Sequence, residues 1–191
     1  MTLALEDRAM KDDILIADTP KAQRRKRRLR GLTHTGRLWK HSKIADINGI
    51  VPQADLDDML VFTLVRNPWD RMVSYYHWLQ DQGFDHPSVR LAQSVGFAQF
   101  LHDPGTRAAM QANPYSSYVQ PATNAVYVRL EHLQTDLGPV AAHLGFTPHM
   151  TRVNTSDRAR DWRGYYSAAD VDHVAKTCAA DVAQFGYVFE K

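Results

Sequence analysis

The feature that most constrains this chain is an apolar run that stops at an arginine and is followed at once by a turn and a helical pattern. Residues 60–65 are apolar apart from Thr63. Such a run predicts a strand buried on both faces, as in a parallel sheet. Asn67-Pro68 then signals a turn, and Pro68 suits the first turn of a helix. The segment therefore predicts a strand, a turn and a helix in immediate succession.

Arg66 and the start of the predicted helix lie next to each other in the sequence and are candidates for one binding site. Apolar and aromatic residues recur at helical spacing from Trp69 onward, at Met72, Val73, Tyr76 and Leu79. Arg66 should therefore lie at the carboxyl end of a parallel strand beside a helix N-terminus, where open α/β sheets bind ligands and anions are favoured. The Arg66 fork and the Ser74 hydroxyl could together hold a phosphate. The alternative is that Arg66 only pairs with the nearby Asp70.

Residues 65–76 resemble the 3′-phosphate-binding segment of the PAPS-dependent sulfotransferases, especially the carbohydrate-type family with its V-R-N-P-W-D-R-x-x-S-x-Y pattern. PAPS is 3′-phosphoadenosine 5′-phosphosulfate, the sulfonate donor. The resemblance implies that Arg66 and Ser74 hold the 3′-phosphate of this nucleotide. It leaves Arg71 open, as a further ligand or a structural residue.

Weaker matches follow in the family's order, so that the resemblance covers roughly residues 38–191. Residues 126–133 resemble the strand that ends in Arg-Leu-Glu. The C-terminal part resembles the family's end, with Asn154-x-Ser156, the pair Tyr165-Tyr166 and a helix that finishes in Phe-Gly-Tyr.

The fold expected from these observations is a single α/β domain over residues 1–191. The resemblance implies the sulfotransferase fold, a P-loop-NTPase-like parallel central sheet flanked by helices. Local patterns predict further strands and helices. These are strands at 14–17 and 125–133, and helices at 2–10, at 38–47, from Asp136 to Gly145, and from Ser167 to Gly186.

The family's phosphate loop, Pro-Lys-Thr-Gly, has no counterpart in the sequence. Pro20-Lys21 is followed by Ala22 without a nearby glycine, and residues 2–10 resemble the helix that follows the loop in relatives. We therefore expect the chain to lack the first strand and loop, and with them the main 5′-phosphosulfate contacts. A misassigned start, a truncation and a true loss are all compatible with this, and each should lower affinity and turnover.

Sulfonate transfer also needs a base, and His41 resembles a histidine between the phosphate loop and the arginine strand of relatives. Histidine suits proton abstraction near neutral pH. Lys40 or Lys43 could help neutralise the sulfonate, and Glu131 is an alternative base. No set of His, Cys and carboxylate residues has metal-ligand spacing, so we expect no metal.

Charge is concentrated near the N-terminus, although the net charge is only +2. Residues 1–50 contain 12 Lys/Arg against 6 Asp/Glu, and residues 21–30 alone contain seven of these cations. A solvated helix, a patch for an anionic substrate and a nucleic-acid contact would each fit. The first two are favoured over nucleic acid because the run lacks interleaved aromatics and a recognisable nucleic-acid fold.

Composition argues against a membrane-spanning or a secreted protein. No stretch approaches the ~20 apolar residues of a membrane span, and the acidic N-terminal segment does not read as a signal peptide, so we expect a cytoplasmic chain. The single cysteine, Cys178, is expected to be a packed thiol.

The function expected from the sequence is transfer of a sulfonate from PAPS to a hydroxyl or amine, with a carbohydrate as the expected acceptor. One alternative is a catalytically inactive, nucleotide-binding relative of the same fold. The other is a basic nucleic-acid-binding protein.

Overall fold

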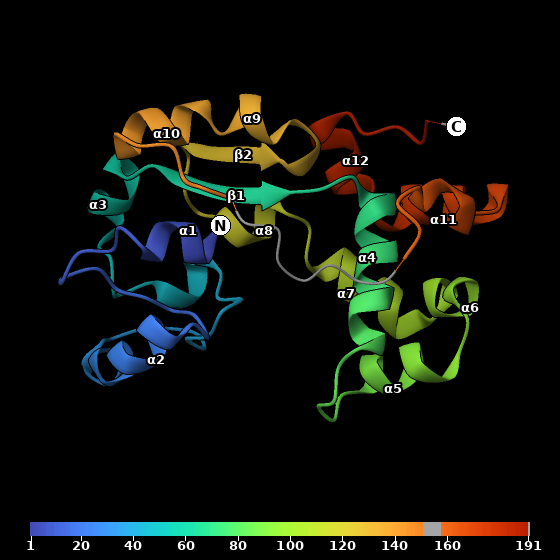
Figure 1. The fold of residues 1–191 in the computed structure, drawn as a ribbon, viewed down its shortest axis with the longest axis horizontal. Coiled ribbons are helices and arrows are strands. Elements are labelled where there is room, and N and C mark those ends of the chain that lie inside the picture. Colours follow the sequence, from blue (N-terminus) through green and yellow to red (C-terminus); the bar gives the residue numbers. More distant parts are fainter. Residues whose placement is uncertain (151–157, 191) are drawn as a thin grey trace. The chain divides into compact units, whose positions relative to one another are not determined.

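The chain has an α/β fold with a small parallel sheet flanked by helices (Figure 1). The computed structural model describes residues 1–150 and 158–190, so the predicted Asn154-x-Ser156 motif lies outside the described residues. The fold groups into two compact units. Unit 1 comprises Met1–Val65 and Ser116–Arg152, and unit 2 comprises Arg66–Tyr115 and Val153–Lys191.

Unit 1 contains the sheet. Strands β1 (Val61–Val65) and β2 (Ala125–Arg129) pair in parallel, with Val61 opposite Ala125 and Val65 opposite Arg129. The α-helices of this unit are α1 (Thr2–Glu6), α2 (Pro20–Arg25), α3 (Gln53–Asp58), α8 (Ser116–Val119), α9 (Leu133–Asp136) and α10 (Gly138–Leu144). Its 3₁₀ helices are η1 (Lys26–Gly31), η2 (Ile44–Ile47) and η3 (Leu130–His132).

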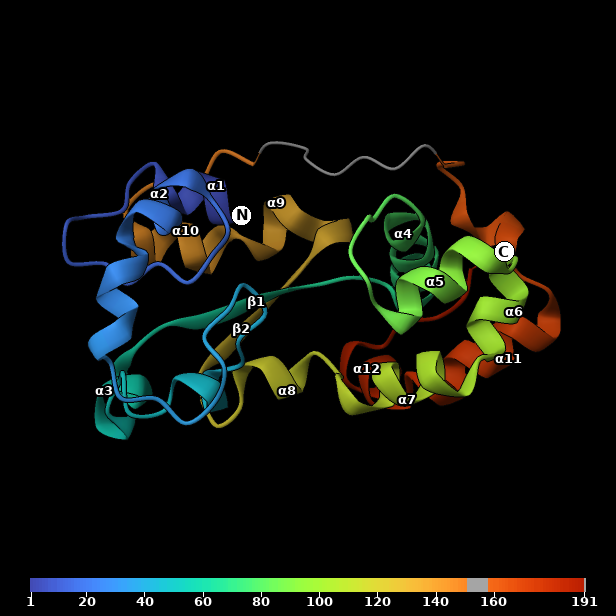
Figure 2. The ribbon, with the colours of Figure 1, turned by 90° about the horizontal axis from the view of Figure 1, so that it is seen from below.

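Both faces of the sheet are covered, which explains the apolar sequence of its strands. Alternate side chains of a strand point to opposite faces. Phe62, Leu64 and Val128 pack with residues of α9 and α10. Val61 and Tyr127 pack in a second cluster with residues of α3 and α8. The two groups of helices lie on opposite sides of the strands in Figure 2.

Unit 2 is helical and is built around α4 (Pro68–Gln80). Five of its side chains, which recur on one face of the helix, are at most 6% exposed: Trp69, Met72, Val73, Tyr76 and Leu79. They form one core with residues from the other helices of the unit. These elements are α5 (Pro87–Ser94), α6 (Phe97–His102), α7 (Pro104–Ala112), η4 (Trp162–Tyr165), α11 (Ala168–Thr177) and α12 (Ala179–Phe185).

Several local predictions are confirmed. The strand at 60–65 and the helix after Asn67-Pro68 form as expected. A helix begins after Ser167 as expected, and Ser167 and Asp170 form its capping box. Gly145 and Gly186 end α10 and α12 in the left-handed conformation, with φ of 71° and 65°. Cys178 is packed, and burial raises the pKa of its thiol to about 11.

Two predictions in the N-terminal region are wrong. Residues 14–17 are not a strand, because among the described residues only β1 and β2 pair into a sheet. The predicted helix at 38–47 is reduced to η2. The Ser42 hydroxyl accepts from the Trp39 N–H and lies 2.8 Å from the carbonyl of Arg37, so a side chain occupies backbone groups that a helix would use.

The second strand and the C-terminal helix are both shorter than predicted. Strand β2 ends at Arg129, because Asp136 accepts hydrogen bonds from the Arg129 backbone N–H and guanidinium and the chain turns into η3. Asp136 therefore ends α9 and does not cap α10, whose N-cap is Leu137. The helix after Ser167 is interrupted at Cys178, whose φ of −104° and ψ of 29° are not helical.

No helix in the described part of the chain combines the length and the apolar character needed to cross a membrane.

A buried ion pair joins α4 to α12 within unit 2. Arg71 Nη1 lies 3.1 Å from Asp181 Oδ2, and Asp181 also accepts from the Tyr115 N–H at 2.8 Å. The Asp181 side chain is 2% exposed and that of Arg71 16%. Burial raises the pKa of Asp181, while the Tyr115 N–H and Arg71 oppose this. Burying this carboxylate costs folding free energy. Removing it would cost more, because the largely buried Arg71 would lose its counter-charge.

We expect Asp181→Ala to lower the free energy of unfolding by about 3–5 kcal/mol, because it leaves the Arg71 charge buried and unpaired. Asp85→Ala is the matched control, since Asp85 also pairs with an arginine, Arg90, but on the surface. It should cost no more than about 1 kcal/mol. Urea unfolding of the two variants measures the difference, and equal losses would contradict this role of the buried pair.

Candidate anion site

The first turn of α4 is shaped by the residues that precede it. Asn67 is the N-cap, and its side-chain oxygen accepts from the Trp69 N–H at 3.0 Å. Pro68 occupies the first helical position, where no N–H is needed. Because Asn67 already satisfies one of the free N–H groups of the helix, an anion at this place would depend mainly on side chains.

Trp69 fixes this turn to the C-terminal part of unit 2. Its indole Nε1 donates to the carbonyl of Val171 at 3.1 Å, and its own carbonyl accepts from the Tyr166 hydroxyl at 2.7 Å. Burial raises the pKa of Tyr166, so its hydroxyl remains a donor. The segment from 158 to 171 is thereby held beside the start of α4.

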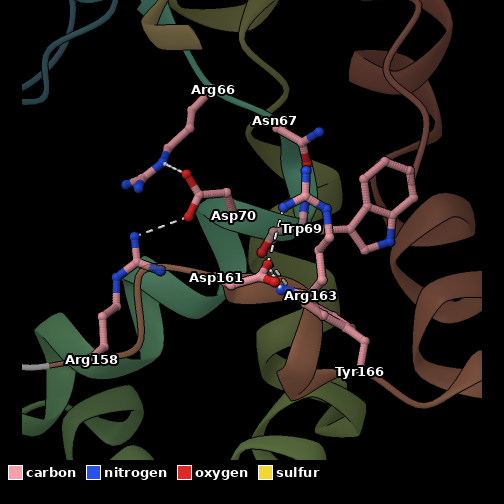
Figure 3. Close-up of polar contacts among 8 residues, drawn as sticks. All are labelled: Arg66, Asn67, Trp69, Asp70, Arg158, Asp161, Arg163 and Tyr166. Atoms are coloured by element: carbon pink, nitrogen blue, oxygen red, sulfur yellow. Dashed lines mark hydrogen bonds and ion pairs between the residues drawn. The ribbon is translucent and has the colours of Figure 1, made fainter. Parts of the chain in front are cut away.

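Asp70 is shared by two arginines, one on each oxygen. Arg66 Nε lies 2.5 Å from Asp70 Oδ2, and Arg158 Nη2 lies 3.0 Å from Asp70 Oδ1. Figure 3 shows the two guanidinium groups reaching the carboxylate from different directions, while Asp161 and Arg163 form a separate pair. The side chains of Arg66, Asp70 and Arg158 are 24%, 15% and 13% exposed.

The pairing with Asp70 leaves part of each fork available. An arginine has five N–H donors, and the contacts with Asp70 use Nε of Arg66 and Nη2 of Arg158. Arg158 Nη1 is buried and has no hydrogen-bond partner in residues 1–150 and 158–190. Ser74 lies one turn beyond Asp70 on the same face of α4, and its half-buried hydroxyl has no hydrogen bond to another described residue.

These contacts bear on both sequence interpretations of Arg66. The ion pair with Asp70, weighed as the alternative, is present. It does not neutralise the cluster, because two arginines share one carboxylate and a charge of +1 remains. Two guanidinium groups and a hydroxyl beside a helix start can bind a phosphate or sulfate group.

Arg158 is the member of this cluster that sequence reasoning missed. It lies 88 positions beyond Asp70, in a loop where several arginines occur within a few residues, and no local pattern distinguishes it from its neighbours. Asp70 indicates indirectly that a second partner is needed. A carboxylate expected to be half-buried beside one arginine has a second oxygen that also needs a partner.

The other predicted site residues lie in unit 1. His41 is in an exposed turn, with its ring 4.7 Å from that of Trp39. Partial burial and the charge of Lys40 lower its pKa, while Asp18 opposes them. The imidazole is therefore neutral at pH 7 and can accept a proton. Glu131 lies in η3 and not at the end of a strand.

Six of the seven cations in the basic run fall into two groups, which differ in their contacts. Lys21, Arg25 and Arg28 donate to backbone carbonyls of the segment 6–13 and hold it in place. Arg24, Arg27 and Arg30 are exposed and follow one another at three-residue spacing along α2 and η1. About half of the run therefore has a structural use, and the solvated-helix and substrate-patch interpretations of its exposed cations stay predictions.

Comparisons of the chain with known protein families, with curated proteins and with solved structures gave no match.

We expect Asp70→Ala to destabilise the fold much more than Arg66→Ala. Removing Asp70 leaves Arg158 poorly solvated and unpaired, which should cost about 2–4 kcal/mol. Removing Arg66 leaves Asp70 paired with Arg158, and should cost about 1 kcal/mol or less. Chemical unfolding of both variants tests this, and an Arg66→Ala loss as large as that of Asp70→Ala would argue against the shared carboxylate.

Replacing one group of the basic run should affect the free energy of unfolding much more than replacing the other. Replacing Arg24, Arg27 and Arg30 together by Gln should change the free energy of unfolding by less than about 0.5 kcal/mol for each residue. Replacing Lys21, Arg25 and Arg28 by Gln should cost about 1–3 kcal/mol in total, because backbone carbonyls lose charged donors. Thermal unfolding of the two triple variants, which carry the same charge change, is the measurement. Indistinguishable midpoints would contradict the division.

Proposed function

We propose that this chain is a PAPS-dependent sulfotransferase whose 3′-phosphate site consists of Arg66 and Ser74, joined by Arg158. The carrying observation is the placement of two arginines around Asp70, directly after β1 and at the start of α4. A 3′-phosphate would bind the guanidinium N–H groups that Asp70 does not use and accept a hydrogen bond from Ser74.

The proposed reaction moves a sulfonate from PAPS to a hydroxyl or amine of an acceptor, for which a carbohydrate is the proposed class. The acceptor oxygen or nitrogen forms a bond to sulfur, the bond from sulfur to the bridging phosphate oxygen breaks, and PAP leaves. His41 is the proposed base for the acceptor proton, since its lowered pKa keeps the imidazole neutral at pH 7. The parallel pairing of β1 and β2, with Arg66 following β1, supports the sulfotransferase fold as part of this proposal.

A second candidate is a nucleotide-binding protein of the same fold that does not transfer. It is favoured by the contacts of Lys21, the one lysine that follows a proline as in the family's phosphate loop. Lys21 Nζ donates to the carbonyls of Glu6 and Ala9, and Pro20 begins α2. This lysine is therefore engaged in holding the chain and not in cradling a phosphate.

The first test is thermal unfolding with and without PAP, the desulfonated nucleotide. At a hundredfold excess over its dissociation constant, PAP should stabilise the fold by about 2.7 kcal/mol. For a chain of this size the unfolding midpoint should rise by roughly 5–10 °C. Arg66→Ala should abolish the rise.

Two controls separate a 3′-phosphate site from general anion binding. ADP, which lacks the 3′-phosphate, should give a much smaller rise. Arg90→Ala removes an exposed arginine of the same unit and should leave the response to PAP unchanged. Equal responses to PAP in the wild type and in Arg66→Ala would refute the proposed site. A PAP response without sulfonate transfer to any acceptor would favour the second candidate.

A further inference from the structure

A histidine of α4 lies next to the anion site and has no assigned role. His77 follows Ser74 by three positions, so the two side chains are neighbours on the helix surface. Its Nε2 atom is buried and has no hydrogen-bond partner among the described residues. Among buried polar atoms this is uncommon, and each such atom needs a physical account.

Arg158 connects this histidine with the phosphate site. Arg158 binds Asp70 through Nη2, and its charge also acts on His77. The Nη1 atom of Arg158, like Nε2 of His77, is buried and makes no hydrogen bond within the described part of the chain. Asp70, Ser74 and His77 follow one another along one face of α4, so Arg158 is a neighbour of both ends of this row.

The surroundings of His77 oppose a positive charge in the absence of a ligand. Burial and the charge of Arg158 lower the pKa of His77, whereas Asp81 acts in the other direction. The other described neighbours are the rings of Tyr165 and Tyr76, with centroids at 5.4 and 5.3 Å. The imidazole is therefore neutral at pH 7.

A bound phosphate would reverse this balance. Arg66, Arg158 and Asp70 together carry a charge of +1. A phosphate monoester carries a charge close to −2 at pH 7, so the occupied site would have an excess of about one negative charge. A negative charge near an imidazole favours its protonated form.

We propose that His77 is a proton-accepting member of the anion site, and that a phosphate bound by Arg66, Ser74 and Arg158 is accompanied by uptake of one proton at His77. This inference rests on the proposed 3′-phosphate site. Proton uptake makes binding pH-dependent. Affinity is greatest where His77 is protonated in the complex, and it falls as the pH rises through the pKa of His77 in the complex.

The test compares PAP binding by the wild type and by His77→Gln between pH 6 and pH 8.5. The phosphate itself gains negative charge as the pH rises through about 6, and this affects the wild type and the variant equally. A rise in the pKa of His77 on binding predicts that the wild type binds about five- to tenfold more tightly than the variant at pH 6. The two affinities should converge at pH 8.5. His143→Gln, at an exposed histidine of α10, should follow the wild type throughout.

A second readout does not depend on the variant's affinity. The imidazole C2 proton of His77 is identified by NMR from its absence in His77→Gln, or by sequential assignment if that variant does not fold. Its titration midpoint should move upward when PAP is added.

The possible failures are distinguishable. If PAP binds but the wild type and His77→Gln share one pH dependence, and the His77 titration does not move, the inference is overturned and the 3′-phosphate site stands. If the wild type binds no PAP at any pH, both are overturned.

Discussion

The three hydrogen bonds of Trp69 hold together the part of the molecule on which the candidate site depends. Its backbone N–H is taken by Asn67, its carbonyl by the Tyr166 hydroxyl, and its indole N–H by the carbonyl of Val171. These contacts set the start of α4 against the C-terminal segment, which brings Arg158 to Asp70. The site is therefore a product of packing between distant segments as much as of the motif itself.

The motif Asn67-Pro68-Trp69-Asp70-Arg71 has a structural use at every position. Asn67 caps the helix, Pro68 begins it, Trp69 anchors it, Asp70 joins two arginines and Arg71 binds the buried Asp181. Arg66 and Ser74, which flank this block, retain donor groups that the described contacts do not use. The resemblance to a known family thus combines two kinds of constraint, one from folding and one that we assign to ligand binding.

The sequence predicted those features that depend on neighbours in the chain. The strand at 60–65, the start of α4, the start of α11 after Ser167 and the glycine at the end of α12 are all specified within a few residues. Predictions failed where a side chain competed for the backbone, as Ser42 does in the segment 38–47. They also failed where Asp136 binds Arg129 and ends β2. Arg158 could not be found in this way, because its partner lies 88 positions away.

The separation of these partners has a consequence for how the molecule acquires its site. Asp70 and Arg158 are 88 residues apart, Trp69 and Val171 are 102 apart, and Arg71 and Asp181 are 110 apart. Contacts of such high contact order close long loops and form late, whereas a capped helix such as α4 can form from local interactions. During synthesis on the ribosome, residues 66–74 would leave the exit tunnel long before Arg158. The nascent chain would therefore expose Arg66 and Ser74 well before the candidate anion site could be completed.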